Sequence, residues 1–277
     1  MTPLSGRVLR YVAECGILVS QQVARITGTG SSGIGKHLRT LYDHGFVERV
    51  PVPMATLLPE SARRDPALMF TLGQDAYKPT RAGLDWLVTY GLADESWRKR
   101  RIPDFSAGNT YFLAHEVLAR DVRVWLELCA STHGGECLDW RYGPEAHRSD
   151  VRPDAAFRFA LPSGDTFTGL VEADRGTERG EKWWWAKVAA YSEMPDSGQV
   201  EYVVVVTLDE ARRDRIAGHA TGSGVARAFF CCVREDLYTG GMDLAVWRRP
   251  GLEGLHRLVP DKYLVGTSEI SRKNSQN

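Results

Sequence analysis

Apolar residues recur at helical spacing through the first fifty residues, and small or polar residues separate the periodic segments. Residues 6–19 and 20–28 each show the pattern of a short amphipathic helix. A turn of glycine and serine follows. A third helix is expected before Gly45, with an apolar stripe made of Ile34, Leu38 and Leu41. Residues 46–50 have the composition of a strand, so the pattern predicts two short helices, a third helix and a strand.

The order of these elements, with the segment QQVARITG…IGKHLRTLYDHGFVER, resembles winged-helix DNA-binding domains over roughly residues 5–90. The resemblance implies that the third helix enters the major groove of DNA with its N-terminal residues toward the base edges. The residues placed near DNA are then Ser32, Gly33, Lys36, His37 and Arg39. The wing would span about 50–77, where Arg63 and Arg64 suit contacts to phosphates. The alternative is a helical hairpin packed for stability, in which Lys36 and Arg39 are merely solvated.

The segment from Asp154 to Asp174 alternates between apolar and polar residues, which predicts two strands joined by a tight turn. One face carries the apolar side chains Phe157, Phe159, Leu161, Phe167, Val171 and Ala173. The opposite face carries the carboxylates Asp154, Glu172 and Asp174. Pairing Asp154 with Asp174 requires a three-residue loop at 163–165, with Gly164 left-handed, or a bulge elsewhere. Glu172 then lies beside Ala156 on the same face.

Three clustered carboxylates repel one another, so they are tolerated only if water solvates them or if a divalent cation neutralises them. Hard oxygen ligands of this kind suit Mg²⁺ or Mn²⁺. The pattern therefore leaves two interpretations open. One is a wet polar face of the sheet, and the other is a metal site with Asp154, Glu172 and Asp174 as its ligands.

A helix is expected after this hairpin, and Lys187 and Tyr191 share one face of it because they are four residues apart. The three consecutive tryptophans at 183–185 cannot all face the same way. At least one is expected in the core, and one can be exposed as a stacking platform for a nucleobase. Residues 201–207 form a continuous apolar run that is typical of a central strand buried on both faces. The segments ARAFFCCV and MDLAVWR are expected to form further strands.

Pro153-Asp154, followed after the hairpin by Glu172-Ala173-Asp174, resembles the motif of the PD-(D/E)XK nuclease-like fold. The third position of that motif is usually a lysine, and Lys187 in KVAAY is similar to the replacement that some members take from the following helix. The resemblance implies four catalytic residues, namely Asp154, Glu172, Asp174 and Lys187. It also implies a Mg²⁺ or Mn²⁺ ion held by the three carboxylates. Glu116 matches an acid that this fold carries on the preceding helix.

The whole architecture, a winged helix followed by LAHEVLARDVRV, RPDAAF, EADRGTE and KVAAY, resembles the replication-relaxation family of plasmids and integrative elements. The expected fold is mixed α+β, with a winged helix-turn-helix DNA-binding domain at 1–95, a linker at 96–108 and an α/β PD-(D/E)XK nuclease-like domain at 109–277. The implied function is DNA binding in plasmid replication or relaxation, with metal-dependent nicking. The alternative is a non-catalytic DNA-binding regulator whose nuclease-like domain is an inactive platform for binding or dimerisation. Covalent attack by a tyrosine is a third mechanism, but no tyrosine stands out for it.

The formal charge is zero but uneven, because residues 1–101 carry 14 Lys and Arg against 9 Asp and Glu. A basic module of this kind suits a polyanion. Double-stranded DNA is the expected partner, with single-stranded DNA and a second copy of the chain as further candidates, and no membrane. Five cysteines, with an adjacent pair at 231–232, argue against a disulfide framework and favour the cytoplasm. Cys129, His133 and Cys137 have metal-ligand spacing, but three ligands interrupted by two glycines make a poor zinc site.

Overall fold

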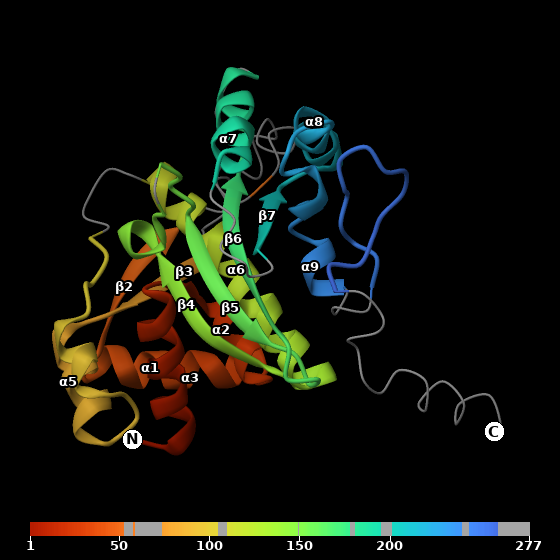
Figure 1. The fold of residues 1–277 in the computed structure, drawn as a ribbon. Coiled ribbons are helices and arrows are strands. Elements are labelled where there is room, and N and C mark those ends of the chain that lie inside the picture. Colours follow the sequence, from red (N-terminus) through yellow and green to blue (C-terminus); the bar gives the residue numbers. More distant parts are fainter. Residues whose placement is uncertain are drawn as a thin grey trace. The chain divides into compact units, whose positions relative to one another are not determined.

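The computed structural model describes residues 1–52, 58, 74–104, 110–148, 150–177, 181–194, 201–239 and 244–259. They form a mixed α+β chain with a three-stranded and a five-stranded sheet (Figure 1). The chain divides into two compact units, Met1–Val124 and Trp125–Asn277. The division falls inside the long helix α6, Thr110–His133.

The first unit begins with a helix, a short strand and two further helices, and continues with two strands and a helix. The elements are α1 (Pro3–Cys15), β1 (Leu18–Val19), α2 (Ser20–Thr27), α3 (Ser31–Asp43), β2 (Val47–Val52), β3 (Gln74–Pro79), α5 (Arg81–Thr89) and the 3-10 turn η3 (Glu95–Lys99). The sheet has the order β1-β3-β2, and its strands are antiparallel. The three helices and the strand expected before residue 52 are present, and the predicted apolar stripe of α3 is buried.

The first half of α6 packs into this unit through buried polar side chains. Gln22 is fully buried and donates from Nε2 to Asp121 at 2.7 Å and to the Val117 carbonyl at 2.8 Å. Arg120 donates to the carbonyl of Cys15 at 3.0 Å. Buried polar groups need such partners, so these bonds fix the helix against α1 and α2. The sequence-based domain limits instead assigned all of α6 to the second domain.

The second unit is built around the five-stranded sheet β4-β5-β6-β7-β8, in which the first three strands are antiparallel and the last three parallel. Its elements are β4 (Glu136–Tyr142), η4 (Gly143–Ala146), β5 (Ala155–Ala160), β6 (Thr166–Asp174), α7 (Lys182–Ser192), β7 (Glu201–Thr207), α8 (Glu210–Ala220), η5 (Ala226–Ala228), β8 (Phe229–Val233) and α9 (Asp236–Thr239). The edge strand β4 was not predicted. The described part of MDLAVWR forms only isolated bridges, between Cys231 and Arg248 and between Trp247 and His256.

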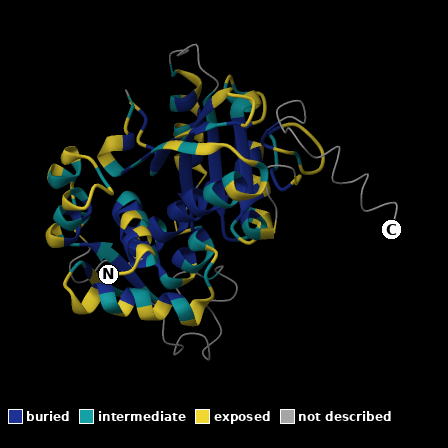
Figure 2. Cartoon of the chain, turned by 90° about the horizontal axis from the view of Figure 1, so that it is seen from below, coloured by how far each residue is buried: buried dark blue, intermediate teal, exposed yellow. Residues whose placement is uncertain are grey.

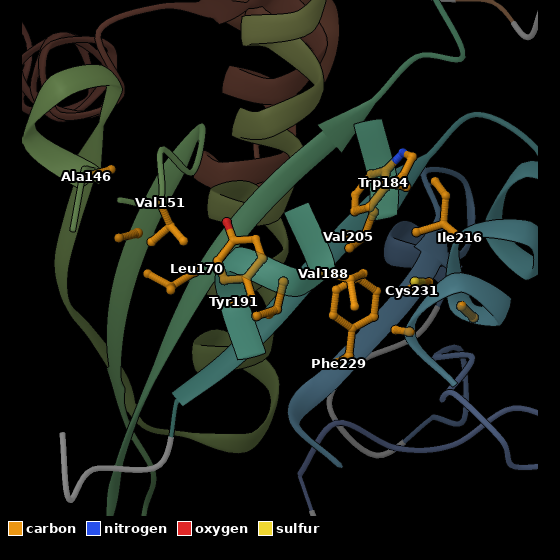
Figure 3. Close-up of a cluster of buried hydrophobic side chains, with 14 residues drawn as sticks. Ala146, Val151, Leu170, Trp184, Val188, Tyr191, Val205, Ile216, Phe229 and Cys231 are labelled. Atoms are coloured by element: carbon orange, nitrogen blue, oxygen red, sulfur yellow. The ribbon is translucent and has the colours of Figure 1, made fainter. Parts of the chain in front are cut away.

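Helices α7 and α8 cover one face of this sheet. Leu170 of β6 and Val205 of β7 pack there against Val188 of α7 and Ile216 of α8 (Figure 3). The opposite face carries a row of touching aromatic rings that includes Phe167, Tyr202, Phe230, Trp247 and Trp125 of α6. Both faces are therefore covered, and the strands are mostly buried (Figure 2). As predicted, β7 is a central strand whose valines are buried.

The β5–β6 hairpin has a three-residue loop, as predicted, but the loop comprises residues 162–164 and not 163–165, and the pairing differs from the expected one. Leu161 and Asp165 bracket the loop, because the Leu161 amide donates to the Asp165 carbonyl at 2.8 Å. Gly164 has φ 88°, the left-handed conformation that a glycine adopts easily. Ala155 pairs with Val171, so the next position outward places Asp154 opposite Glu172, not opposite Asp174. The loop contains residues 162–164, and this moves the register by two residues.

The even-numbered face of the hairpin is not the solvated surface that was one of the two interpretations of the sequence. It lies beneath α7, where Ala156 and Leu170 belong to the apolar cluster of Figure 3. Glu172 and Asp174 are 2% and 5% exposed. The alternation identified the shared face correctly, but a helix that follows later in the chain removes that face from water.

Candidate active site

Asp154 and Glu172 lie next to each other at the end of the sheet where β6 terminates. Asp154 directly precedes β5 and is half-buried, and its Oδ2 accepts a hydrogen bond from the Ala173 amide at 2.8 Å. Glu172 lies near the carboxyl end of β6. Strands β6, β7 and β8 are parallel, so their carboxyl ends meet at this edge, which is where open α/β sheets commonly bind ligands.

Helix α7 supplies two donors to Glu172. Lys187 Nζ lies 2.8 Å from Oε2, and the Tyr191 hydroxyl donates to Oε1 at 2.5 Å. The two side chains are four residues apart, so they project from the same face of the helix, as predicted. Helix α7 is the crossover between β6 and the parallel strand β7, so it packs over one face of the sheet. The resulting cluster of Asp154, Glu172, Lys187 and Tyr191 is the candidate active site.

Burial dominates the electrostatics of this cluster. Burial, and next the negative charge of Asp154, raise the pKa of Glu172 from 4.5 to about 7, against the opposing effects of Lys187 and Tyr191. Burial and the charge of Glu172 also raise the pKa of Tyr191 above its ordinary value. Tyr191 therefore remains a hydrogen-bond donor at neutral pH.

Asp174 belongs to a separate arrangement. Arg212 of α8 binds both of its oxygens, at 2.9 Å and 2.7 Å, Trp184 Nε1 donates at 2.6 Å, and the Gly176 amide donates at 2.7 Å. Burial alone would raise the pKa of Asp174, but Arg212 and then the other donors outweigh it and hold the pKa below its usual value. Asp174 thus links β6 to α7 and α8 as a fixed anion, with its acceptor sites taken by four donors.

The described residues contain no group of three His, Cys, Asp or Glu side chains placed to hold a metal ion. The predicted ligand set of Asp154, Glu172 and Asp174 is accordingly not assembled as a three-carboxylate site, because Asp174 is engaged by Arg212. The two carboxylates that do lie together are Asp154 and Glu172.

The raised pKa of Glu172 gives a prediction about stability and pH. A carboxyl group with a folded-state pKa near 7 binds protons better when folded, so its contribution is complete below its ordinary pKa of 4.5 and is lost as the pH rises through 7. Between about pH 5 and about pH 8 the wild type is expected to lose roughly 1–3 kcal/mol relative to Glu172→Gln. Urea unfolding at several pH values measures this. Glu193→Gln, at the exposed end of α7, is the control, and parallel curves for wild type and Glu172→Gln would refute the assignment.

Glu116, expected as an additional acid, lies in the first half of α6. It forms an ion pair with Arg120 at 2.5 Å and belongs to the first unit, whereas Asp154 and Glu172 belong to the second. Of the three residues with metal-ligand spacing, Cys129 is buried in α6, and the Cys137 thiol contacts the Asp139 carbonyl at 3.5 Å. All five cysteines are free thiols.

The predicted DNA-contacting residues of α3 have different surroundings. Ser32 and Lys36 are exposed. Arg39 is exposed, and its Nε donates to both carboxylate oxygens of Asp43, at 2.8 Å and 2.9 Å. His37 turns toward α1, where its Nδ1 lies 2.9 Å from Ser5 Oγ. Arg63 and Arg64 lie outside the described residues.

The partners of Asp174 were not recognised from the sequence. Arg212 follows β7 in a polar helix with several arginines, and nothing in its spacing distinguishes it from its neighbours. Trp184 gave a weak signal, because three successive tryptophans require at least one buried ring and a buried indole N–H needs an acceptor. The role of Tyr191 was available from its spacing with Lys187.

Comparison with protein families shows that the model of the Replication-relaxation family matches residues 9–204. The matched range contains α3, both clustered carboxylates and α7. Comparisons with curated proteins and with solved structures give no significant match. In the described part of the chain, no helix is long and apolar enough to cross a membrane.

Proposed function

Because the chain belongs to the replication-relaxation family, which indicates a role in the replication of a plasmid or other mobile element, we propose that it binds and nicks the DNA of that element. Asp154, Glu172 and Lys187 are the proposed catalytic residues, and Mg²⁺ or Mn²⁺ is the proposed cofactor. The reaction is hydrolysis of a phosphodiester, in which water adds to phosphorus and the bond to one sugar oxygen breaks.

One observation carries the catalytic proposal: Lys187 reaches the buried Glu172 from α7, beside Asp154, at the carboxyl edge of the sheet. This supports the resemblance to PD-(D/E)XK nucleases in the form where the lysine comes from the following helix. A buried carboxyl group whose pKa is shifted and that has a specific cationic neighbour is typical of a functional site.

The two neighbouring carboxylates fit a divalent cation. Mg²⁺ is commonly held by one or two carboxylates together with phosphate oxygens of the substrate. Burial, and next the charge of Asp154, raise the pKa of Glu172, and a bound cation would favour the charged form of Glu172. When bound, such an ion lowers the pKa of water and polarises the phosphate. Asp154 and Glu172 would hold such an ion only with Glu172 deprotonated, so we expect the affinity for the ion to rise with pH.

The remaining residues orient the site. Tyr191 holds one oxygen of Glu172 and thereby fixes the rotamer of that side chain. Lys187 is about 29% exposed in its side chain, so its ammonium group can meet a phosphate oxygen of the substrate while it contacts Glu172. A cation at that position stabilises the charge that develops on the phosphate in the transition state.

We also propose that the first unit is a winged-helix DNA-binding module. The order of three helices and a sheet arranged β1-β3-β2 supports this, and so does the exposed first half of α3. In that arrangement α3 lies in the major groove, and Ser32 and Lys36 face the DNA. Arg63 and Arg64 remain proposed phosphate contacts.

Replacing Lys36 and Arg39 together by alanine is expected to weaken duplex binding about tenfold or more. The log–log salt slope should fall by about 0.9 for each phosphate that the protein no longer neutralises. Fluorescence anisotropy at several salt concentrations measures both quantities. Asp43→Ala is the informative companion, because it removes a negative charge and releases Arg39 from its ion pair, so it should strengthen binding. Affinity that responds neither to salt nor to the double replacement would exclude α3 as the DNA contact.

A second candidate function is a non-catalytic DNA-binding platform. The burial of Glu172 and its existing hydrogen bonds favour it. Both oxygens of Glu172 already accept hydrogen bonds, and Glu172 is almost completely buried. In such a protein the cluster would stabilise the fold without meeting DNA. Calorimetric titration with Mn²⁺ distinguishes the two candidate functions. A nuclease should bind Mn²⁺ in a way that Asp154→Ala abolishes, whereas a non-catalytic platform should show no such binding.

A further inference from the structure

The three consecutive tryptophans of α7 occupy different environments. Trp184 is 1% exposed and donates to Asp174, whereas Trp183 and Trp185 are 57% and 53% exposed. All eight tryptophans of the chain are described, and these two are the ones with exposed rings. Two large apolar rings therefore face solvent in the first turn of the helix that supplies Lys187.

The helical spacing places the two rings on opposite flanks of α7. Trp183, Lys187 and Tyr191 follow one another at intervals of four residues, so they form a row along one side of the helix. Trp183 accordingly lies one turn before Lys187, which contacts Glu172. Trp185 lies on the other flank, where its ring is 5.0 Å from that of His219 on α8.

We propose that Trp183 is a stacking platform for an unpaired nucleobase, and that the site therefore takes single-stranded or locally unpaired DNA. The inference rests on the proposed function, because it names the substrate of the same site. An exposed indole beside an ammonium group suits one nucleotide: the ring stacks on the base, and Lys187 meets the adjoining phosphate. Base stacking on aromatic side chains together with basic contacts to the backbone is the usual mode of single-strand binding.

The same chemistry disfavours intact duplex as the ligand of Trp183. In a duplex both faces of each base are covered by neighbouring bases, and only the base edges are accessible in the grooves. An indole ring can reach a base face only where the base is unpaired and unstacked. The two units then have different ligands: the first binds duplex through α3, and the second holds an unpaired strand next to Asp154 and Glu172.

The test uses the full chain in EDTA, so that no cleavage occurs. Binding is measured for a fluorescein-labelled thymidine oligonucleotide and for a blunt duplex of the same length. Trp183→Ala is expected to weaken binding of the oligonucleotide roughly tenfold and to leave duplex binding within about twofold. Trp183→Phe, which keeps an aromatic face, should recover part of the loss. Trp185→Ala is the matched control, because it removes an equally exposed ring from the same turn, and it should leave both affinities within about twofold.

A second readout reports stacking itself. A 2-aminopurine in the single-stranded gap of a duplex should be quenched by the wild type and by Trp185→Ala, but not by Trp183→Ala. Equal effects of the two alanine replacements, or a loss of duplex binding equal to the loss of single-strand binding, would overturn the proposal. These measurements need no catalysis. If the wild type does not nick plasmid, only the proposed function is contradicted. If Trp183→Ala nicks normally and binds the oligonucleotide as tightly as the wild type, only the stacking platform is contradicted.

Discussion

Lys187→Ala is expected to slow the nicking of supercoiled plasmid by roughly a hundredfold or more, because loss of one charged donor from a transition-state site commonly has this effect. Lys187 is the cation that lies against Glu172, and its partly exposed ammonium group can also meet the substrate. Divalent-ion binding above pH 8 should persist, since the carboxylates remain in place. The Lys187→Ala variant is thus expected to bind the metal ion but to nick DNA slowly.

The control is Lys182→Ala, which removes an exposed lysine from the first turn of the same helix. It should nick at a rate close to that of the wild type. Single-turnover assays on supercoiled plasmid give the rates, and calorimetry with Mn²⁺ gives the affinity. If the two lysine variants nick equally fast, then Lys187 has no role in the chemistry and contributes only to the packing of α7.

Asp174→Ala is expected to destabilise the second unit by about 3–5 kcal/mol, the usual effect of removing one partner of a buried ion pair. The change leaves the Arg212 guanidinium and the Trp184 indole N–H without their acceptor, and both groups are largely buried. Since domains are stable by only about 5–15 kcal/mol, this is a large share of the total. The melting temperature, followed by circular dichroism, should fall by roughly 10 °C.

Asp165→Ala is the matched control, because Asp165 is an exposed loop carboxylate bound to Ser163. It should change stability by about 0.5 kcal/mol or less. Asp174→Lys, which would restore the usual lysine of the nuclease motif, is expected to be worse than Asp174→Ala, because it places a second cation against Arg212 in a buried position. A stable Asp174→Lys protein would show that the Arg212 pair does not hold the two helices to the sheet.

Local pattern was sufficient to predict much of this chain. The 3.6-residue period located α1, α2 and α3, and the two-residue period located β5 and β6 and assigned their carboxylates to one face. The run of valines in β7 predicted a strand buried on both sides. The placement of Lys187 and Tyr191 on one face of α7 followed from helical geometry alone. Each of these features depends on residues within a few positions of one another.

The features that could not be predicted depend on residues far apart in the sequence. The burial of Glu172 depends on α7 folding back over the sheet, and the role of Asp174 depends on Arg212, which lies 38 residues further on. The register of the hairpin depends on which three residues form the loop. The alternation of apolar and polar residues cannot identify them, because a shift of two residues leaves each side chain on the same face. The strand β4 alternates only weakly at an edge, where one side faces solvent.

Nicking of supercoiled cognate plasmid by the wild type, Asp154→Asn and Glu172→Gln, with Mg²⁺ or Mn²⁺ and with a chelator, tests the central claim most directly. Both substitutions keep the shape of the side chain and remove its negative charge, so neither variant should be able to hold the cation. We expect nicking by the wild type only when the metal is present, and none by either variant. Nicking that survives in both variants, or a wild type that leaves the plasmid intact with either metal, would contradict the catalytic role of Asp154 and Glu172.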